Sequence, residues 1–435
     1  MSLGHGASEI WTSPALPYLK SNESEIIVSA GQGPWITSLH NVGGVIGHLL
    51  YPLLVDRIGR KYTLLTFLIP QITTWFLIYF ANNVQTLYVA RTLGGIGYST
   101  AFVIQGIYLG EIAEKKVRGT MVLIAKIFYS IGTLTVVTAG AFASYDTLNL
   151  ILLLTSLLSF TIVFIPESPY YYLKKNRDQD AMKSLSKLRG TNDVEEIRQE
   201  MYRIKENIIE GQIHEQWSLR KLFQTKRNRK AFLIVFIANV TLPFSGLYAI
   251  ASYSQEIFTH SGILLDPKYA VVVLSTVTFI FIIITTPFAD YFGRRILSLY
   301  SGIISGSSLA VIGLFFFFKH HPEIADLSSV SWMVLVAMII FEVAFATGLI
   351  STAVILASEL FPLEVKSSAL ALLHLILDLL FFLVKLGFEW SVKTMGIYNL
   401  FWTYATCCFI LPFLNFYIMP ETKGKTLEEI QKLLD

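Results

Sequence analysis

The sequence predicts an all-α membrane protein with twelve membrane-spanning helices in two duplicated halves. Three observations support this prediction. The 435 residues are 53% hydrophobic and only 15% charged, with a mean hydropathy of +0.56, whereas soluble domains carry about 25% charged residues. Apolar runs of about 20 residues, the length of a helix that crosses a bilayer, recur along the chain. Short charged motifs occur once in each half, in the same order.

These repeated motifs punctuate the apolar runs. The first half holds Asp56-Arg57-Ile58-Gly59-Arg60-Lys61, Glu111 followed by Arg118, and Pro166-Glu167-Ser168-Pro169. The second half holds Asp290-Tyr291-Phe292-Gly293-Arg294-Arg295, Glu359 followed by Lys366, and Pro420-Glu421-Thr422. Duplicated membrane halves are typical of transporters.

The expected spans follow the apolar runs in order. They are 1–19, 33–54, 62–81, 86–108, 119–142, 147–165, 230–257, 269–289, 296–318, 332–357, 367–391 and 397–419. Most of the 34 Lys and Arg residues then lie in segments on one side, which is the cytosolic side by the positive-inside rule. Both termini are therefore expected in the cytosol, and the protein in the plasma membrane.

Four parts are expected along the chain. An N-terminal six-helix part spans 1–165, a C-terminal one spans 230–419, and a cytosolic tail spans 420–435. The charged segment 166–229 is expected to be a cytosolic linker with amphipathic helices, because its apolar residues recur at helical spacing, as in Ile197, Met201, Ile204 and Ile208. The first span begins directly at Met1, so a natural start and a missing N-terminal piece are both open.

The chain shows no signature of an enzyme, a cofactor site or a metal site. No phosphate loop, nucleophile elbow or metal-ligand spacing occurs, and the net charge of +3 does not indicate nucleic-acid binding. The adjacent Cys407 and Cys408 form no disulfide framework and are expected to pack in the last span. Asn22-Glu23-Ser24 is a candidate glycosylation sequon in an outer loop.

The motif set resembles the sugar porters of the major facilitator superfamily. The resemblance rests on the repeated motifs above and on three further runs, Tyr108-Leu109-Gly110-Glu111-Ile112, Glu359-Leu360-Phe361-Pro362 and Pro420-Glu421-Thr422-Lys423-Gly424-Lys425. The run Trp11-Thr12-Ser13-Pro14-Ala15-Leu16-Pro17 is similar to the branch of insect facilitated trehalose transporters. The resemblance implies two six-helix bundles around a central cavity that opens alternately to either side.

The resemblance also implies a cytosolic gate made of the repeated charges. When the inner side is closed, these charges are expected to pair across helix ends as a latch of several weak links, each worth about 0–1 kcal/mol. The alternative is that they only anchor the chain by the positive-inside rule. The expected gate residues are Asp56, Arg57, Arg60, Glu111, Arg118, Glu167, Asp290, Arg294, Arg295, Glu359 and Glu421.

The chain departs from the family pattern where the resemblance places the sugar. Leu242-Pro243-Phe244-Ser245-Gly246-Leu247-Tyr248 lacks the usual glutamine pair and puts Tyr248 at an asparagine position, and Leu377-Asp378 replaces an Asn-Trp pair. Sugars are held by planar amides and aromatic faces, so these changes should weaken or redirect hexose binding. The candidate substrate-binding residues are Lys126, Ser245, Gly246, Tyr248, Tyr253 and Asp378.

Lys126 adds a charge near the middle of the fifth span, where the family carries glutamine. A central charge costs about 2.5–3.5 kcal/mol on insertion scales, so Lys126 should face the cavity. Its possible charge partners, or sites of proton coupling, are Glu9, Glu342 and His374, together with Asp378. A silent Lys–acid pair is equally compatible with the sequence. Lys385 is expected to snorkel toward the outer end of its span.

The predicted function is transmembrane transport of a sugar, trehalose or a related one, by alternating access. The bound partners would be a small-molecule solute and the lipid bilayer. A proton-coupled carrier of an acidic or non-hexose organic solute is the first alternative, favoured by Lys126 and Asp378. A non-transporting nutrient sensor or degenerate paralogue is an alternative of another class.

Overall fold

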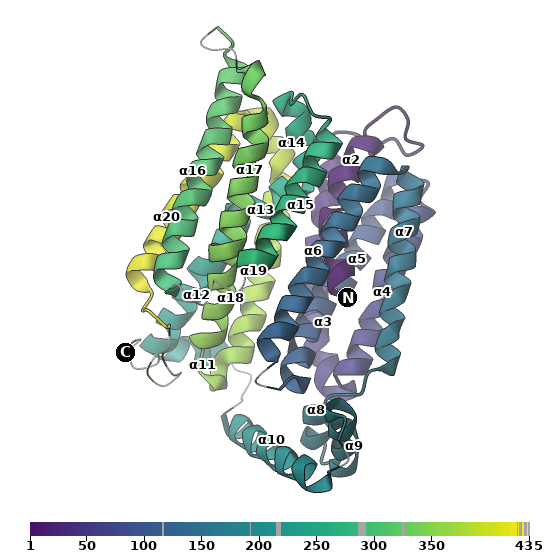
Figure 1. Ribbon diagram of the computed structural model, residues 1–435, viewed down its shortest axis with the longest axis vertical. Coiled ribbons are helices and arrows are strands. Elements are labelled where there is room, and N and C mark those ends of the chain that lie inside the picture. Colours follow the sequence, from purple (N-terminus) through teal and green to yellow (C-terminus); the bar gives the residue numbers. More distant parts are fainter. Residues whose placement is uncertain are drawn as a thin grey trace.

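The computed structural model describes residues 1–114, 117–191, 193–214, 219–285, 293–323 and 327–423, together with 425, 429 and 433. Within these residues all regular structure is helical, and two helical bundles stand side by side (Figure 1). The predicted all-α membrane fold with twelve helical segments in two halves is confirmed. We call each of these segments, whether it is one helix or an interrupted one, a rod.

The first half contains six rods, two of which change helix type or direction along their length. The rods are α1 Ser2–Ile10 with α2 Thr12–Leu19, α3 Gly33–Ile58, α4 Arg60–Tyr79, α5 Val84–Ile112, α6 Arg118–Phe142, and α7 Tyr145–Leu157 with the 3₁₀ segment Leu158–Phe164.

The second half repeats this plan. Its rods are α12 Lys226–Phe244 with α13 Leu247–Ser252 and α14 Ser254–Ser261, α15 Pro267–Thr285, α16 Arg294–His320, α17 Trp332–Ala344 with the π turn Phe345–Ile350 and α18 Ser351–Glu359, α19 Leu363–Met395, and α20 Ile397–Ile418. A short 3₁₀ turn, Ser328–Val330, precedes α17.

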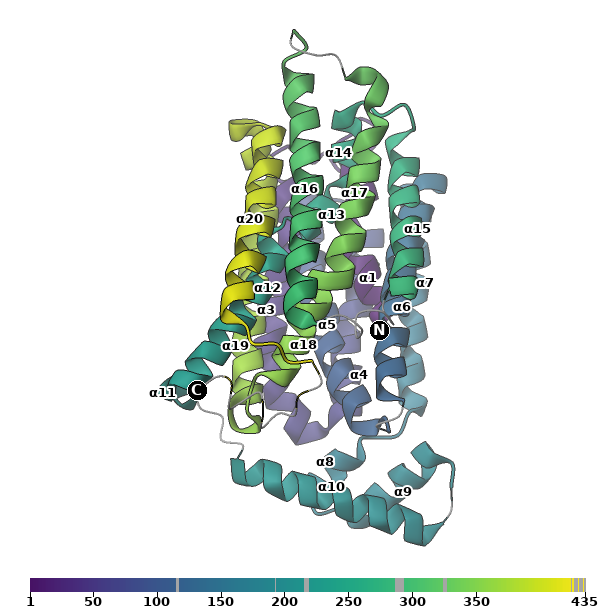
Figure 2. The ribbon, with the colours of Figure 1, turned by 60° about the vertical axis from the view of Figure 1, so that its left-hand side comes forward.

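The linker forms a layer under one end of the bundles. It contains α8 Pro169–Lys174, α9 Asp178–Arg189, α10 Val194–His214 and α11 Leu219–Gln224. The helices α8 and α9 lie below the first half, and α10 extends from them to α19 of the second half (Figure 2). The residues Ile197, Met201 and Ile204 are buried in one apolar cluster with α8 and α9. The apolar side of α10 thus packs on α8 and α9. We call this end of the molecule the linker end and the opposite end the distal end.

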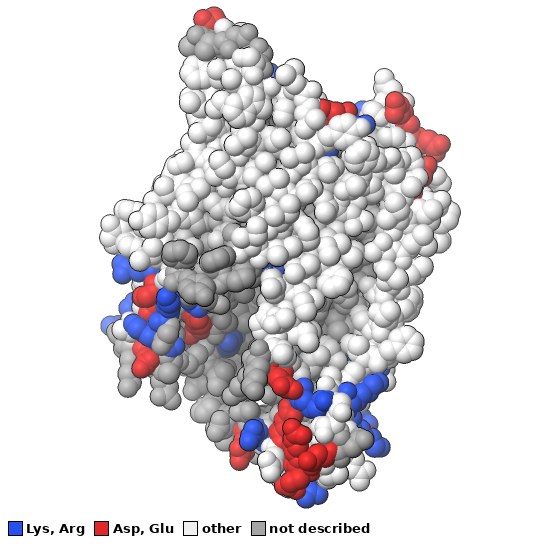
Figure 3. Space-filling model, in the orientation of Figure 1, with Lys and Arg blue, Asp and Glu red and all other residues white. Residues whose placement is uncertain are grey.

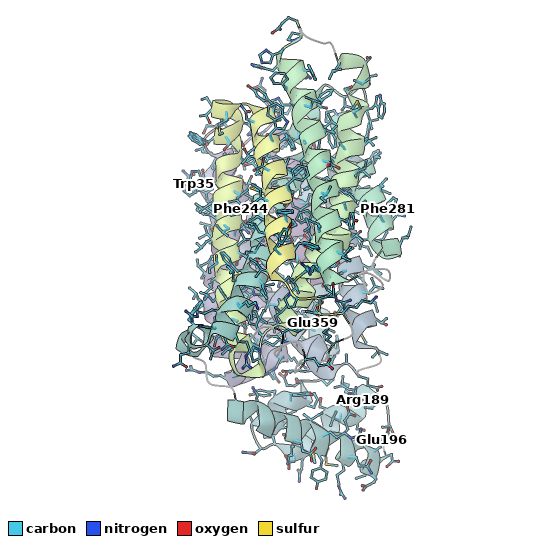
Figure 4. All side chains as sticks on the ribbon, turned by 90° about the vertical axis from the view of Figure 1, so that its left-hand side faces the viewer. Trp35, Arg189, Glu196, Phe244, Phe281 and Glu359 are labelled. Carbon is cyan, nitrogen blue, oxygen red and sulfur yellow. The ribbon has the colours of Figure 1, made fainter. Side chains whose placement is uncertain are left out.

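The sides of the bundles are apolar, as a lipid-facing surface requires. Charged side chains gather at the linker end, a few lie at the distal end, and a broad uncharged belt separates them (Figure 3). Large side chains such as Trp35, Phe244 and Phe281 are exposed on these sides (Figure 4). Among the described residues, nine helices are long and apolar enough to cross a membrane.

Three expected spans, 1–19, 33–54 and 86–108, are not among those nine because they form the more polar, glycine-containing interior of the first half. A Cβ atom added at Gly43 of α3 would collide with the Thr92 carbonyl of α5, and one at Gly95 of α5 would collide with the His40 carbonyl of α3. Small residues bring these two backbones into contact, as is typical of helix pairs in membranes.

Two expected spans are interrupted. The first one bends at Trp11, where Pro14 and Pro17 cannot donate backbone hydrogen bonds. The seventh one, expected as a single helix over 230–257, breaks at Gly246, whose φ of 74° is in the left-handed region. The ring of Tyr404 occupies the space that a Cβ at Gly246 would need.

We therefore expect Gly246→Ala to destabilise the protein. The strained backbone alone costs about 1–3 kcal/mol, and the added methyl group must also displace Tyr404. The measurement is the melting temperature of the detergent-solubilised protein. Gly387→Ala is the matched control, because a Cβ at that helical position meets no atom within 4 Å. Equal melting temperatures for the two variants would contradict this role of Gly246.

Candidate functional site

A cavity of about 140 Å³ lies between the two halves. The first half lines it with α1 and α6, and the second half with α13, α15, α17 and the π turn. Most of the wall is apolar. Its polar side chains are Glu9, Tyr129, Ser130, Thr133, Tyr248, Ser275, Thr278 and Glu342. A cavity built from both halves has the geometry that a carrier with two moving bundles requires.

The structure separates the candidate binding residues of the seventh span. Tyr248 lines the cavity, with its ring edge-to-face against Phe381 at a centroid distance of 4.8 Å. Ser245 is fully buried, donates to the Leu242 carbonyl and accepts from Leu247 N–H, so it stabilises the break in the helix. Gly246 forms that break and does not line the cavity.

Tyr253 is a packing residue in this structure. Its ring is buried and stacks on Phe388 at a centroid distance of 4.4 Å, nearly parallel at 7°. The hydroxyl group donates a long bond of 3.5 Å to the carbonyl of Lys385. Tyr253 does not line the cavity.

Glu9 joins the two halves at the edge of the cavity. Lys385 of α19 donates to the Glu9 carboxylate at 2.9 Å, and His40 Nε2 of α3 lies 3.3 Å from it. The Lys385 side chain is only 1% exposed. The expectation that Lys385 snorkels was therefore wrong, because a carboxylate inside the bundle stabilises its charge where it lies.

Asp378 makes a second contact between the halves. Its carboxylate is 2.7 Å from Nδ1 of His48 on α3, and both side chains are buried. His374, which the sequence places one turn from Asp378, has its Nδ1 2.7 Å from the Leu370 carbonyl of its own helix. The ring of His374 lies 5.7 Å from the ring of His48, so His374 lies beside the His48–Asp378 contact.

The remaining candidates lie on α17 and α6. Glu342 lines the cavity and accepts a hydrogen bond of 2.7 Å from Thr278 of α15. Lys126 is half-buried and does not line the cavity. It precedes Tyr129 and Ser130 by three and four residues, so it lies on the cavity-facing side of α6, one turn nearer the linker end.

The distal end is closed by an ion-pair cluster that the sequence did not indicate. Lys20, just after α2, donates to Glu256 of α14 and to Glu389 of α19, each at 2.8 Å. Burial lowers the pKa of Lys20, but the two carboxylates outweigh burial and raise this pKa above its ordinary value. Lys20 therefore stays charged near neutral pH, and it would lose its charge, and with it the ion pairs, as the pH rises through the raised pKa. We call these three residues the distal clasp.

The run Trp11–Pro17 contributes further contacts at this end. Thr12 donates to the Ser252 carbonyl at 3.3 Å, and the hydroxyl groups of Ser13 and Ser254 lie 2.8 Å apart. These bonds link the first half to the second beside the clasp. Asn22, the candidate glycosylation site, is exposed in the turn after α2.

The repeated charged motifs form the same structure in both halves at the linker end. Glu167 accepts from the backbone N–H groups of Arg60 and Lys61 at the start of α4, at 2.9 and 3.0 Å. Glu421 accepts from those of Arg294 and Arg295 at the start of α16, at 3.0 and 3.2 Å. A carboxylate at a helix N-terminus is stabilised by the free N–H groups and the helix dipole.

A glycine precedes each of these helix starts. A Cβ at Gly59 or at Gly293 would collide with the carboxylate of Glu167 or Glu421. Burial raises the pKa of Glu167, while the backbone donors oppose that rise. The order of Gly and Arg that the two halves share therefore reflects the close approach of a carboxylate from the end of the same half.

The other gate residues are also paired within their own half. Arg60 binds Glu111 at 2.8 Å and Asp56 at 3.3 Å, and Arg294 lies 3.7 Å from Glu359. Figure 4 shows Glu359 at the bottom of its bundle, above Arg189 and Glu196 of the linker layer.

The remaining gate residues predicted from the sequence are Arg57, Arg295, Asp290 and Arg118. Arg57 is exposed, and its carbonyl accepts from Tyr171 at 2.8 Å. The guanidinium of Arg295 lies over the Phe416 ring, 4.2 Å from the centroid. Asp290 and the Arg118 side chain lie outside the described part of the chain.

Three charged or titratable residues of the site were missed by the sequence analysis. His40 and His48 were overlooked because their partners lie on other helices, and Arg91 because its role is to bind backbone. Arg91 is fully buried and donates to the carbonyls of Ile36 and Ser8, which fixes α1 and α3 against α5.

Among the described residues, no group of His, Cys, Asp and Glu could hold a metal ion. Cys408 is buried and Cys407 half-buried, both as free thiols.

Two similar six-helix bundles around a shared cavity define the major facilitator fold. The proton:xylose symporter XylE of the major facilitator superfamily, bound to 6-bromo-6-deoxy-D-glucose, matches with a TM-score of 0.77 at 20% identity, over 100% of this chain and 97% of that chain. The inward open conformation of the xylose transporter XylE from E. coli gives 0.79, at the same identity and coverage. These likenesses show the fold.

The sequence comparison narrows the class to a family. The profile of the sugar (and other) transporter family matches residues 13–434, and the chain belongs to this family. It is similar to the facilitated trehalose transporter Tret1 of Anopheles gambiae, with 30% identity over 98% of this chain and 54% of that protein. Tret1 of Apis mellifera ligustica is 28% identical over 99% of this chain and 85% of that protein. The chain spans about half the length of the Anopheles relative.

The Glu9–Lys385 pair leads to a prediction on stability. Lys385→Met leaves the Glu9 carboxylate without its 2.9 Å partner, and breaking a buried pair in this way costs about 3–5 kcal/mol. The double variant Glu9→Gln/Lys385→Met removes both charges and should regain much of the loss. Melting temperatures in detergent measure both effects. A single variant as stable as the unchanged protein would show that the pair carries no such energy.

Proposed function

We propose that the protein is an integral membrane carrier that moves a sugar or sugar-like organic solute by alternating access. The observation that carries the proposal is the cavity, because side chains of both halves line it. A solute held between two bundles is exposed to one side or the other as the bundles rock. Membership of the sugar (and other) transporter family supports a sugar as the solute.

The ion pairs support two alternating states. The distal clasp crosses from the first half to the second. At the linker end, the ion pairs Arg60–Glu111 and Arg294–Glu359 each join residues of the same half. This arrangement is expected of a state that is closed at the distal end. In the opposite state, the gate charges would pair between the halves and the clasp would separate.

We further propose that the linker end faces the cytosol and that both termini are cytosolic, in the plasma membrane. The linker layer and the repeated motifs place most of the Lys and Arg residues at this end (Figure 3), in agreement with the positive-inside rule. Asn22 would then face the outside, where a glycan could be attached.

Trehalose is the first solute to test, because relatives that align over nearly the whole of this chain are named facilitated trehalose transporters. Uptake of labelled trehalose, with labelled glucose in parallel, would be measured in oocytes that express the chain, at neutral and acidic outside pH. Saturable trehalose uptake is expected. Absence of uptake of either sugar, with the protein present at the cell surface, would exclude trehalose and glucose as solutes. Absence of uptake of any sugar or sugar-like solute would overturn the proposal and favour a sensor.

The clasp gives a prediction on conformation. Lys20→Gln removes the amine that holds Glu256 and Glu389, so the distal end should open more often. A cysteine introduced at Ala251, which lines the cavity, would report this as faster labelling by an impermeant thiol reagent from the distal side. Cys407 and Cys408 would first be replaced by serine.

A matched control for this labelling is Lys319→Gln, because Lys319 lies at the distal end but binds a carbonyl, that of His260, within its own half. Labelling from the distal side that is unchanged in Lys20→Gln would exclude the clasp as a gate.

A further inference from the structure

The two acids of the cavity have different surroundings. Glu9 is compensated by Lys385 at 2.9 Å and has His40 at 3.3 Å. Glu342 has Thr278 as its hydrogen-bond donor, at 2.7 Å. Among the side chains that the structure describes, no basic group pairs with Glu342. Within the described part of the chain, the cavity therefore contains a carboxyl group whose charge no basic side chain balances.

An unbalanced carboxylate at this depth needs a partner. A carboxylate that leaves water without a counter-charge is strongly destabilised, and one neutral hydroxyl donor does not replace a cation. The Thr278 hydroxyl fixes the orientation of Glu342 from α15. A ligand in the cavity can supply the missing positive charge.

The rest of the wall indicates the chemistry of that ligand. Ser130, Thr133 and Ser275 present hydroxyl groups to the same cavity, and these groups both donate to and accept from ligand hydroxyls. Tyr129 and Tyr248 add aromatic surface that suits sugar rings, although the Tyr248 ring already has the Lys385 ammonium group 5.8 Å from its centroid. The planar amides expected for a neutral hexose are absent from the corresponding part of the seventh span, where Leu242 and Pro243 stand.

We propose that the cavity binds a sugar-like solute that carries a positively charged amino group, with the Glu342 carboxylate as its counter-ion. The hydroxyl-bearing residues would hold the sugar hydroxyl groups, and Thr278 would act as a positioning residue for Glu342. This proposal rests on the proposed function and specifies the solute class that the carrier prefers. No covalent step is involved.

The test compares solutes that differ in charge. Glucosamine, N-acetylglucosamine and glucose would each compete with uptake of labelled trehalose in oocytes, at a pH where the amine of glucosamine is protonated. Glucosamine should inhibit at about a tenfold lower concentration than the two neutral sugars, since a charge-assisted hydrogen bond to a carboxylate is roughly twice as strong as a neutral one. Glu342→Gln should remove this preference.

Two further variants keep the test independent of folding. Thr278→Val should reduce the preference for glucosamine, because it removes the hydroxyl group that orients Glu342. Glu323→Gln, an exposed acid in the distal loop, should keep the preference and serves as the matched control. Surface expression is measured for all variants, and the ratio of inhibitory concentrations does not depend on it.

The outcomes separate the inference from the proposed function. Equal inhibition by all three sugars, with normal trehalose uptake, would overturn the inference alone. Trehalose uptake that rises at acidic pH through Glu342, without a preference for glucosamine, would also overturn it, because a proton would then balance the carboxylate. If trehalose is not transported, saturable uptake of labelled glucosamine that Glu342→Gln abolishes would still support the inference. Uptake of none of these solutes would overturn both proposals.

Discussion

The structure depends on the high cost of a charge inside an apolar bundle, which is lowered when a partner of opposite charge lies beside it. A buried ion pair contributes little net stability, but separation of its members is costly. In this protein the buried pairs Glu9–Lys385 and His48–Asp378 both connect the first half to α19 of the second half. These two buried contacts between the halves therefore also hold the halves together. Any motion of one bundle against the other has to keep these pairs or replace each member's partner.

At the linker end, a carboxylate pairs with free backbone N–H groups once in each half. In each half a helix, α4 or α16, begins directly after a motif glycine, and the backbone N–H groups at the start of that helix have no partner within the helix. Glu167 and Glu421 satisfy these groups in the two halves, and Gly59 and Gly293 leave room for them. The duplicated motifs therefore describe a structural unit within each half. The arginine side chains of the same motifs can exchange partners without disturbing that unit.

The sequence was sufficient for the elements and their order, because hydrophobic runs and repeated motifs are local signals. It failed where the outcome depends on a partner far along the chain. Lys385 was expected to reach the membrane surface, since nothing near it in the sequence shows that Glu9 lies beside it. His48 and the distal clasp were missed for the same reason. Ser245 and Gly246 were expected to bind the solute, yet they form a helix break that Tyr404 covers, and this is a property of packing. Glu342 was proposed because acids inside apolar spans are rare, and Tyr248 because it stands where the family pattern has an asparagine; both line the cavity.

The distal clasp contains one amine and two carboxylates. When it separates, the second half retains two negative charges at the mouth and the first half retains a single positive one. The clasp side chains are each about one-fifth to one-quarter exposed, so ions in the medium reach them and screen their attraction over about 8 Å at physiological ionic strength. The salt concentration on the distal side would thus change how often this end is open. High salt would favour an open distal end, and the freed carboxylates would attract cationic solutes to it.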